Sequence, residues 1–129
     1  MILLDSHVLV WAVADSKRLS KDAAAAIRRA RRSDGLAVSA ITTWEIAWML
    51  ATQRVLGYGT IDASVGRFLE GVTVLPITEE IACLGAQFSV DYPRDPADRL
   101  IGGTALAGSL TLVTRDERIR RSPLLKTVW

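Results

Sequence analysis

The sequence contains a single cysteine, Cys83, and a single histidine, His7. One cysteine excludes a disulfide within the chain and a cysteine-rich zinc site, and one histidine excludes a multi-histidine metal site. No apolar run approaches the roughly 20 residues that a membrane-spanning helix needs. Asp5 interrupts the first apolar run, and no basic segment resembling a signal peptide precedes it. We therefore expect a cytoplasmic protein with no membrane partner.

Neither sign of charge dominates the 129 residues. There are 16 Lys and Arg against 14 Asp and Glu, giving a formal charge of +2 and a pI near 9.0. This balance permits a nucleic-acid partner without requiring one. Half of the residues are hydrophobic and 23% are charged, as in globular proteins. No linker or repeat divides the chain, so we expect one domain spanning residues 1–129.

Short β-like runs alternate with helical patterns along the chain. Strands are predicted at 1–4, 36–39, 72–75 and 110–114, with a short one within 124–129. Helical patterns cover 8–11, 21–32, 41–52, 61–69, 78–88 and 100–107, with a turn and short helix at 115–121. Cys83 lies in one of these apolar helical patterns and is predicted to be a core residue. Strands separated by helices predict an α/β fold with a mainly parallel sheet, in which ligands bind beyond the carboxyl ends of the strands.

Acidic residues occur near the ends of the predicted strands. Asp5 directly follows the first strand, and Asp116 lies two residues after the fourth. Either residue alone is typical of a helix N-cap or a turn. Glu45 shares an apolar helical stripe with Trp44 and Trp48, where a carboxylate is costly to bury unless a cation or hydrogen bonds satisfy it. An ion pair with a nearby arginine is the alternative interpretation of Glu45.

A fourth acid, Asp98, lies in the segment Asp95-Pro96-Ala97-Asp98. Asp95 fits an N-cap, Pro96 the first helical position and Asp98 the third, so the start of a helix also accounts for both acids. Four carboxylates in one cleft would repel one another unless a cation joined them. Hard divalent ions such as Mg²⁺ take oxygen ligands and can activate water against a phosphodiester bond.

Four segments carry these acids in order: Leu-Leu-Asp-Ser-His-Val-Leu-Val-Trp at 3–11, Ser-Ala-Ile-Thr-Thr-Trp-Glu-Ile-Ala at 39–47, Arg-Asp-Pro-Ala-Asp-Arg-Leu-Ile at 94–101 and Leu-Val-Thr-Arg-Asp at 112–116. In this order they resemble the acidic motifs of PIN domains. Each motif alone is weak, but together they cover nearly the whole chain in a specific order. The ending on Val128-Trp129 also resembles a subgroup of VapC-type ribonuclease toxins.

The resemblance implies a PIN-like three-layer α/β/α sandwich with a mainly parallel central sheet. It also implies a Mg²⁺-dependent endoribonuclease, with Mn²⁺ as an alternative metal. Such an enzyme would be the toxin of a type II toxin–antitoxin pair, with an RNA substrate, a cognate antitoxin protein and a homodimeric state. Carried over residue by residue, the catalytic and metal-binding acids are Asp5, Glu45, Asp98 and Asp116.

The third motif raises two questions, which concern its acid and the glycine pair that follows. Asp98 matches the family's third acid better than Asp95, because Asp98 directly precedes the Arg-Leu-Ile start of the motif's helix. Gly102 and Gly103 depart from the family, whose members more often carry larger helix formers at these positions. Each glycine costs about 1 kcal/mol of helix stability relative to alanine. The pair therefore either permits close packing or loosens the helix that carries Asp98.

Further residues are candidates for supporting roles, each with a structural alternative. The hydroxyls of Ser6 and Thr114 could hold a metal-bound water or cap the local backbone. Arg115 and Arg118 are predicted to bind RNA phosphates, whereas the run Arg28-Arg29-Ala-Arg31-Arg32 is predicted to face solvent or an antitoxin. His7 could contact substrate, although a lone histidine is more often a packing or capping residue. The side chains that could line an antitoxin groove or a dimer contact, or else pack in the core, are Trp11, Trp44 and Trp48.

Two other functions remain open at this point. A domain of the same fold could bind RNA or a protein without cleaving, although the complete set of four acids argues against this. A phosphatase of the haloacid dehalogenase type would carry a second aspartate two residues after its nucleophile. In this chain Ser6 and His7 follow Asp5, which counts against the phosphatase.

Overall fold

Five strands pair in parallel in the order β3-β2-β1-β4-β5 and form one central sheet. The computed structural model describes all residues from Met1 to Trp129. The strands are β1 (Ile2–Leu4), β2 (Leu36–Ser39), β3 (Val72–Leu75), β4 (Thr111–Val113) and β5 (Thr127–Val128). The helices are α1 (Ser6–Ala14), η1 (Ser16–Arg18), α2 (Lys21–Arg31), α3 (Ala40–Ala51), α4 (Ile61–Phe68), α5 (Glu79–Ala86), α6 (Pro96–Ala107) and α7 (Glu117–Arg120). The predicted α/β fold is therefore confirmed.

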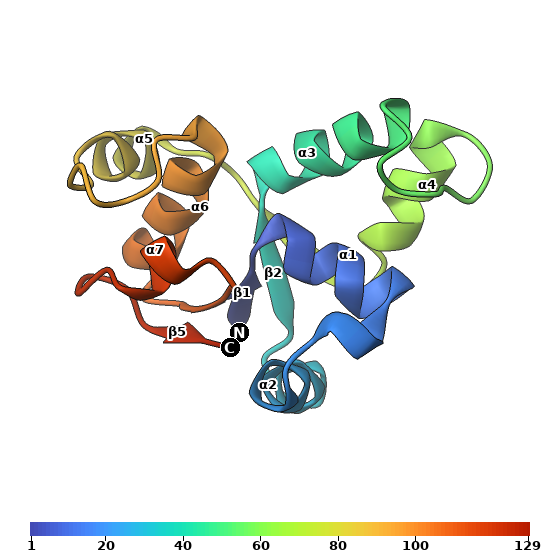
Figure 1. Cartoon of the computed structure of the whole chain (residues 1–129), viewed down its shortest axis with the longest axis horizontal. Helices are drawn as coiled ribbons and strands as arrows, with labels where there is room; N and C mark the ends of the chain where they lie inside the picture. Colours follow the sequence, from blue (N-terminus) through green and yellow to red (C-terminus); the bar gives the residue numbers. More distant parts are fainter.

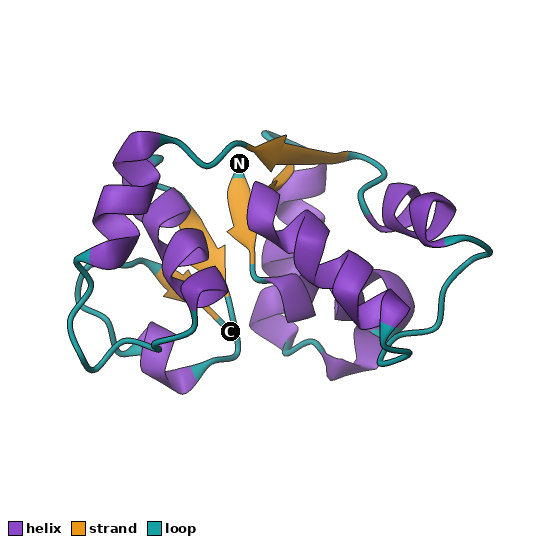
Figure 2. Cartoon of the chain, turned by 90° about the horizontal axis from the view of Figure 1, so that it is seen from above, coloured by secondary structure: helices purple, strands orange, loops and turns teal.

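Helices cover both faces of the sheet, because successive strand residues point to opposite sides. Leu4 and Val38 contribute to a core cluster with α1, α2, α3 and α4, whereas Leu3, Ala37 and Leu112 pack with residues of α6 and α7. Figure 1 shows α1, α3 and α4 on one side of the strands and α5, α6 and α7 on the other. The view from above in Figure 2 shows the strands between these two groups of helices. The three-layer α/β/α arrangement is the one that the family resemblance implies.

The strand order places a topological switch beside β1. The chain runs from β1 through β2 to β3 in one direction, and then returns to β4 on the other side of β1. In parallel sheets, such a reversal opens a crevice beyond the carboxyl ends of the two central strands. The crevice here lies after Leu4 and Val113, the last residues of β1 and β4.

Side-chain caps explain where the helices begin. Ser20, Ser39, Thr60 and Thr78 each accept a hydrogen bond from the first turn of the helix that follows. Such caps satisfy backbone N–H groups that have no partner within the helix. Acidic residues cap the remaining α-helices, which are α1 (Asp5), α6 (Asp95) and α7 (Asp116).

The glycine pair in α6 permits close packing. A Cβ atom on Gly102 would lie 2.3 Å from the hydroxyl oxygen of Tyr92, and one on Gly103 would lie 2.6 Å from the carbonyl oxygen of Ile81. The helix is intact across both positions. The side chain of Tyr92 and the backbone of α5 occupy the space that larger residues would need.

Cys83 is exposed, so its prediction as a core residue is wrong. Helix α5 turns Ile81 and Gly85 toward α6, and both residues are buried. Cys83 lies two positions from Ile81, on the opposite side of the helix. Apolar residues surround most of α5 in the sequence, so the pattern alone does not show which side packs against α6.

The tryptophans of α3 are also more exposed than core residues would be. Trp44 and Trp48 are 58% and 52% exposed, and their rings stack with centroids 5.7 Å apart. Ile46 and Met49 form the buried side of α3. No helix in the structure is both long enough and apolar enough to cross a membrane.

Candidate active site

A cleft of about 210 Å³ at the carboxyl edge of the sheet brings the four predicted acids together. Each acid comes from a different part of the fold: the end of β1, helix α3, the start of α6 and the start of α7. A fifth acid, Asp95, lines the same cleft. The lining residues are Asp5, His7, Val8, Trp11, Glu45, Asp95, Asp98, Arg115 and Asp116.

Asp5 is buried, and both of its carboxylate oxygens accept hydrogen bonds. The backbone N–H of Asp5 continues the β1–β4 ladder by donating to the carbonyl of Val113 at 3.0 Å. Its carboxylate accepts from the backbone N–H of Ser6 at 2.8 Å and from the hydroxyl of Thr114 at 2.7 Å. The same Thr114 hydroxyl accepts from the backbone N–H of Asp116 at 3.1 Å. Thr114 thus links the acids that follow β1 and β4.

Glu45 is fixed by a hydroxyl rather than by an arginine. The Ser6 hydroxyl donates to Oε1 of Glu45 at 2.6 Å. No Lys or Arg side chain forms an ion pair with Glu45, so the arginine pairing considered from the sequence is wrong. The second oxygen, Oε2, accepts no hydrogen bond and stays available to a ligand in the cleft.

Ser6 and Thr114 therefore join three acids in a continuous series. We call the residues Glu45, Ser6, Asp5, Thr114 and Asp116 the acid–hydroxyl chain. Both hydroxyls donate to carboxylates, so neither serves only to cap the local backbone. Because the acid–hydroxyl chain connects α1 and α3 with the residues that follow β1 and β4, it fixes the carboxylates of Asp5 and Glu45 and the backbone of Asp116 relative to the sheet.

Asp98 is held differently from the other three acids. Its carboxylate accepts no hydrogen bond, whereas its backbone carbonyl accepts one from the Tyr92 hydroxyl at 2.7 Å. Asp95 accepts from the backbone N–H of Ala97 at 2.8 Å and acts as the N-cap of α6, as predicted. The position of Asp98 therefore depends on its helix and on Tyr92, and its two carboxylate oxygens are free.

Burial raises the pKa of the Asp98 carboxyl to about 7. The negative charges of Asp5, Asp95, Asp116 and Glu45 add to this rise. The carboxyl group of Asp98 thus lies among charges of its own sign. A cation in the cleft would relieve this repulsion.

The pKa values of Asp5 and Glu45 are also raised, mainly by burial. The hydrogen bond from Thr114 lowers the pKa of Asp5, and the bond from Ser6 lowers that of Glu45, so each opposes the effect of burial. Hydrogen bonds to a carboxylate favour its charged form. The two hydroxyls therefore stabilise charge as well as position.

The donor set of the cleft suits a hard divalent cation. Glu45, Asp98 and Asp116 each keep at least one carboxylate oxygen free of hydrogen bonds. No three acidic, histidine or cysteine side chains converge closely enough to form a ready-made coordination shell. Magnesium commonly uses one or two carboxylates and keeps several waters, so the cleft fits such an ion without a closed protein cage.

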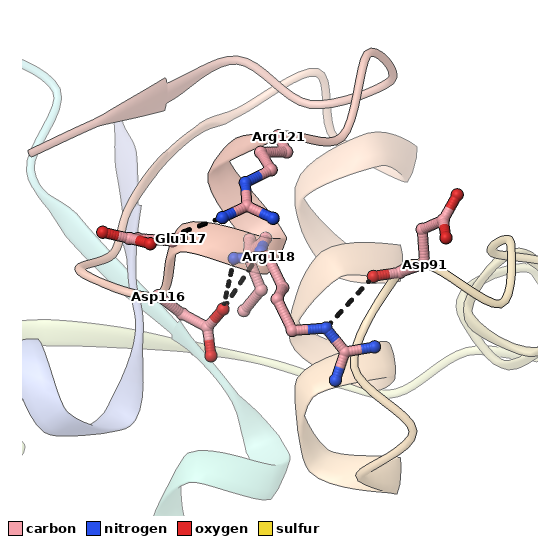
Figure 3. A network of polar contacts seen from close by, with 6 residues as sticks. Asp91, Asp116, Glu117, Arg118 and Arg121 are labelled. Carbon is pink, nitrogen blue, oxygen red and sulfur yellow. Dashed lines mark hydrogen bonds and ion pairs between the residues drawn. The ribbon is translucent and has the colours of Figure 1, made fainter.

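Arg115 and Arg118 have different surroundings. Arg115 lines the cleft, forms no ion pair, and its guanidinium lies 5.9 Å from the ring centroid of Trp11. Arg118 instead donates to the backbone carbonyls of Asp91 at 3.3 Å and Tyr92 at 3.5 Å, as Figure 3 shows for Asp91. The Arg118 guanidinium therefore braces the loop before α6, while the Arg115 guanidinium is free to meet an anion.

Sequence reasoning did not single out Thr42 or Tyr92. The Thr42 hydroxyl is buried 2.8 Å from that of Ser6. The spacing of three residues between Thr42 and Glu45 on one helix was the available signal. The Tyr92 contact crosses from a loop to the following helix and has no comparable local pattern. His7 lines the cleft, with its ring 6.0 Å from that of Trp11.

One known family model matches nearly the whole chain. The family model described as PIN domain matches residues 2–123. The chain belongs to the PIN domain family. It is also 39% identical to Ribonuclease VapC22 of Mycobacterium tuberculosis, over 99% of this chain and 98% of that protein.

Solved structures with the same fold extend over the full chain. One is VapBC2 from Rickettsia felis bound to a DNA fragment from their promoter, with a TM-score of 0.76 and 17% identity, covering 99% of this chain and 98% of that one. Another is a toxin–antitoxin complex from Klebsiella pneumoniae, with a TM-score of 0.69 and 20% identity, covering 100% and 97%. At these identities the likeness concerns the PIN fold.

Proposed function

We propose that this PIN domain is a metal-dependent endoribonuclease and the toxin of a type II toxin–antitoxin pair. The observation that carries the proposal is the convergence of Asp5, Glu45, Asp98 and Asp116 from four elements on one cleft at the switch point of the sheet. The full-length similarity to Ribonuclease VapC22 supports RNA as the substrate class. We also propose that residues 1–129 form one domain and that the protein is cytoplasmic.

Within this proposal the four acids bind Mg²⁺, with Mn²⁺ as an alternative. A divalent ion held there supplies activation of water and stabilisation of charge on the phosphate. Thr114 and Ser6 hold the Asp5 carboxylate through both of its oxygens. Asp98 adds a carboxylate from α6, and its free oxygens face a cleft whose uncompensated negative charge favours cation binding.

Arg115 is the residue that we propose for contact with the RNA phosphate. Its guanidinium has no carboxylate partner although acids line the same cleft. A planar guanidinium can donate two parallel hydrogen bonds to a phosphate. Arg118 contributes indirectly, because its bonds to Asp91 and Tyr92 hold the loop that leads to α6.

An apolar groove of about 530 Å³ beside the cleft is our proposed contact for the antitoxin. Trp11 and His7 line both the groove and the cleft, so a protein segment in the groove would reach the acids. Arg18 and Arg54 outnumber the one acid of its lining, Asp15, which would favour a segment with acidic residues. The similarity in fold to the toxin–antitoxin complex from K. pneumoniae supports a protein partner of this kind.

The exposed pair Trp44 and Trp48 supports a homodimer. Two stacked tryptophans that are each more than half exposed are unusual on a solvated helix. Aromatic side chains are enriched in the buried centres of protein interfaces. We propose that this side of α3 contacts a second copy of the chain, which sedimentation of the Trp44→Ser/Trp48→Ser variant tests.

Cleavage of total cellular RNA by the purified, antitoxin-free protein tests the function. The reactions contain Mg²⁺, Mn²⁺ or EDTA and run beside the Asp5→Asn variant. We expect discrete fragments that require metal and are absent with the variant. Folded, metal-loaded protein that cleaves none of a varied set of RNAs would favour a binding domain without nuclease activity. Cleavage that persists in EDTA or with the variant would mean that the four-acid site is wrong.

A further inference from the structure

The buried hydroxyl of Thr42 is outside the cleft but contacts the acid–hydroxyl chain. Thr42 is fully buried on α3, three residues before Glu45. Its Oγ1 lies 2.8 Å from Oγ of Ser6, and this is its one hydrogen bond. Thr42 does not line the cleft, and its one hydrogen-bonded route to the site is through Ser6.

The chemistry of the neighbours sets the direction of this hydrogen bond. An ionised carboxylate only accepts, so Ser6 must donate its single hydroxyl proton to Glu45. The Ser6 oxygen is then an acceptor toward Thr42, and Thr42 must donate. The resulting series runs in one direction, from Thr42 to Ser6 to Glu45. Hydrogen bonds linked in this way polarise and strengthen one another.

We propose that Thr42 is a positioning residue for Glu45, which it orients through a directional hydrogen bond to Ser6. This inference rests on the proposed function, in which Glu45 is a metal ligand. The Thr42 bond commits the Ser6 proton to Glu45, so Ser6 is not free to donate to a water in the cleft. Hydroxyl partners behind a metal ligand fix its orientation and its basicity.

The test uses a change that removes the hydroxyl and keeps the shape. Thr42→Val replaces the hydroxyl with a methyl group, and Thr42→Ser keeps the hydroxyl. The adjacent residue provides a matched control on the same helix, because Oγ1 of Thr43 is buried and has no hydrogen-bond partner. Thr43→Val therefore makes the same chemical change without touching the series.

Three measurements follow for each variant: Mn²⁺ affinity by titration calorimetry, melting temperature, and kcat and KM for RNA. For Thr42→Val we expect roughly 10-fold weaker Mn²⁺ binding and a similar fall in kcat, at the lower end of effects for residues behind a metal ligand. KM for RNA should not change, because Thr42 does not reach the cleft. Thr42→Ser should restore both values, and Thr43→Val should bind Mn²⁺ like the wild type.

A double variant tests whether Thr42 acts through Ser6. Ser6→Ala should weaken Mn²⁺ binding at least as much as Thr42→Val, because it removes the donor to Glu45 itself. Ser6→Ala/Thr42→Val should bind Mn²⁺ no more weakly than Ser6→Ala. If Thr42→Val does not fold, Thr42→Ala replaces it in both comparisons.

Several results would overturn the inference. Wild-type Mn²⁺ affinity in the folded Thr42 variant would do so, as would an equal loss in Thr43→Val or losses that add in the double variant. Wild-type protein that binds Mn²⁺ but cleaves no RNA would instead overturn the proposed nuclease function, while calorimetry would still test Thr42. Wild-type protein that binds no Mn²⁺ would overturn both.

Discussion

The two halves of the acidic cleft are built in different ways. On one half, side-chain hydroxyls of Ser6 and Thr114 hold the carboxylates of Glu45 and Asp5. On the other half, Asp98 accepts no hydrogen bond at its carboxylate. The fold places Asp98 only through its helix and through the Tyr92 contact to its backbone.

The two halves also differ in how far hydrogen bonds compensate the negative charge of the carboxylates. Burial raises the pKa values of Asp5 and Glu45, and the hydrogen bonds to these carboxylates oppose that rise. Burial and like charges raise the pKa of Asp98 to about 7, with no hydrogen bond to oppose them. We therefore expect a cation in the cleft to stabilise the charged form of Asp98 more than that of the other acids.

The largest expected effect comes from replacing, one at a time, the two acids at the start of α6. Asp98→Asn should abolish RNA cleavage, because it removes the charge that the proposed metal would meet from α6. Asp95→Asn should keep most of the activity, since asparagine caps a helix as well as aspartate does and Asp95 serves as the cap. Cleavage assays on the two variants measure this difference. Loss of activity in Asp95→Asn alone would assign the metal to Asp95 instead.

The second largest effect is expected from removing the Thr114 hydroxyl, in the half of the cleft that hydroxyls hold. Thr114→Val leaves Asp5 without one hydrogen bond and the backbone N–H of Asp116 without an acceptor. We expect about 1–3 kcal/mol less free energy of unfolding and roughly 10- to 100-fold less cleavage. Thr104→Val is the control, because Thr104 is also buried but donates only to the carbonyl of Leu100 in its own helix. Denaturant unfolding and cleavage assays should separate the two; equal losses would refute the role of Thr114.

Filling the space beside Tyr92 should disturb the Asp98 half. Gly102→Ala places a Cβ 2.3 Å from the hydroxyl oxygen of Tyr92, so Tyr92 must move and its bond to the Asp98 backbone is strained. We expect about 1–3 kcal/mol of destabilisation together with weaker Mn²⁺ binding. In contrast, Gly66→Ala in α4 meets no atom within 4 Å and should stabilise the helix by up to about 1 kcal/mol. Urea unfolding of both variants measures whether the free energy of unfolding falls or rises. An unchanged free energy in Gly102→Ala would show that Tyr92 does not hold the Asp98 half of the cleft.

The smallest expected effect is a pH dependence of the metal-free protein. The pKa of Asp98 rises from 3.8 to about 7 on folding, so the folded state binds more protons between these pH values. The contribution of Asp98 to the free energy of unfolding therefore falls as pH rises from about 4 to about 7. Asp98→Asn removes this dependence. In EDTA its melting temperature should match the wild type most closely near pH 4 and exceed it most above pH 7; a constant difference would contradict the account.

Local signals in the sequence predicted much of the fold. The bounds of β2 and the Asp95-Pro96 start of α6 depend on neighbouring residues, and both are confirmed. The exposed position of Cys83 was not predicted, because an apolar pattern around most of a helix does not reveal which side packs.

The site was predicted only in part for a similar reason. The four acids follow recognisable motifs, and the structure places them in one cleft. The contacts that hold them join residues far apart in the sequence. The bond from Ser6 to Glu45 spans 39 positions, and that from Thr114 to Asp5 spans 109. These pairings follow from the order of strands in the sheet, which no single motif encodes.

The central claim is that both halves of the cleft hold one metal centre. The most direct test is a crystal structure of the Mn²⁺-soaked protein with anomalous scattering measured for manganese. We predict an anomalous peak in the cleft with carboxylate oxygens of both Asp98 and the acid–hydroxyl chain in its coordination shell. A peak bound by one half alone, or no peak in the cleft of protein that cleaves RNA with Mn²⁺, would contradict this account.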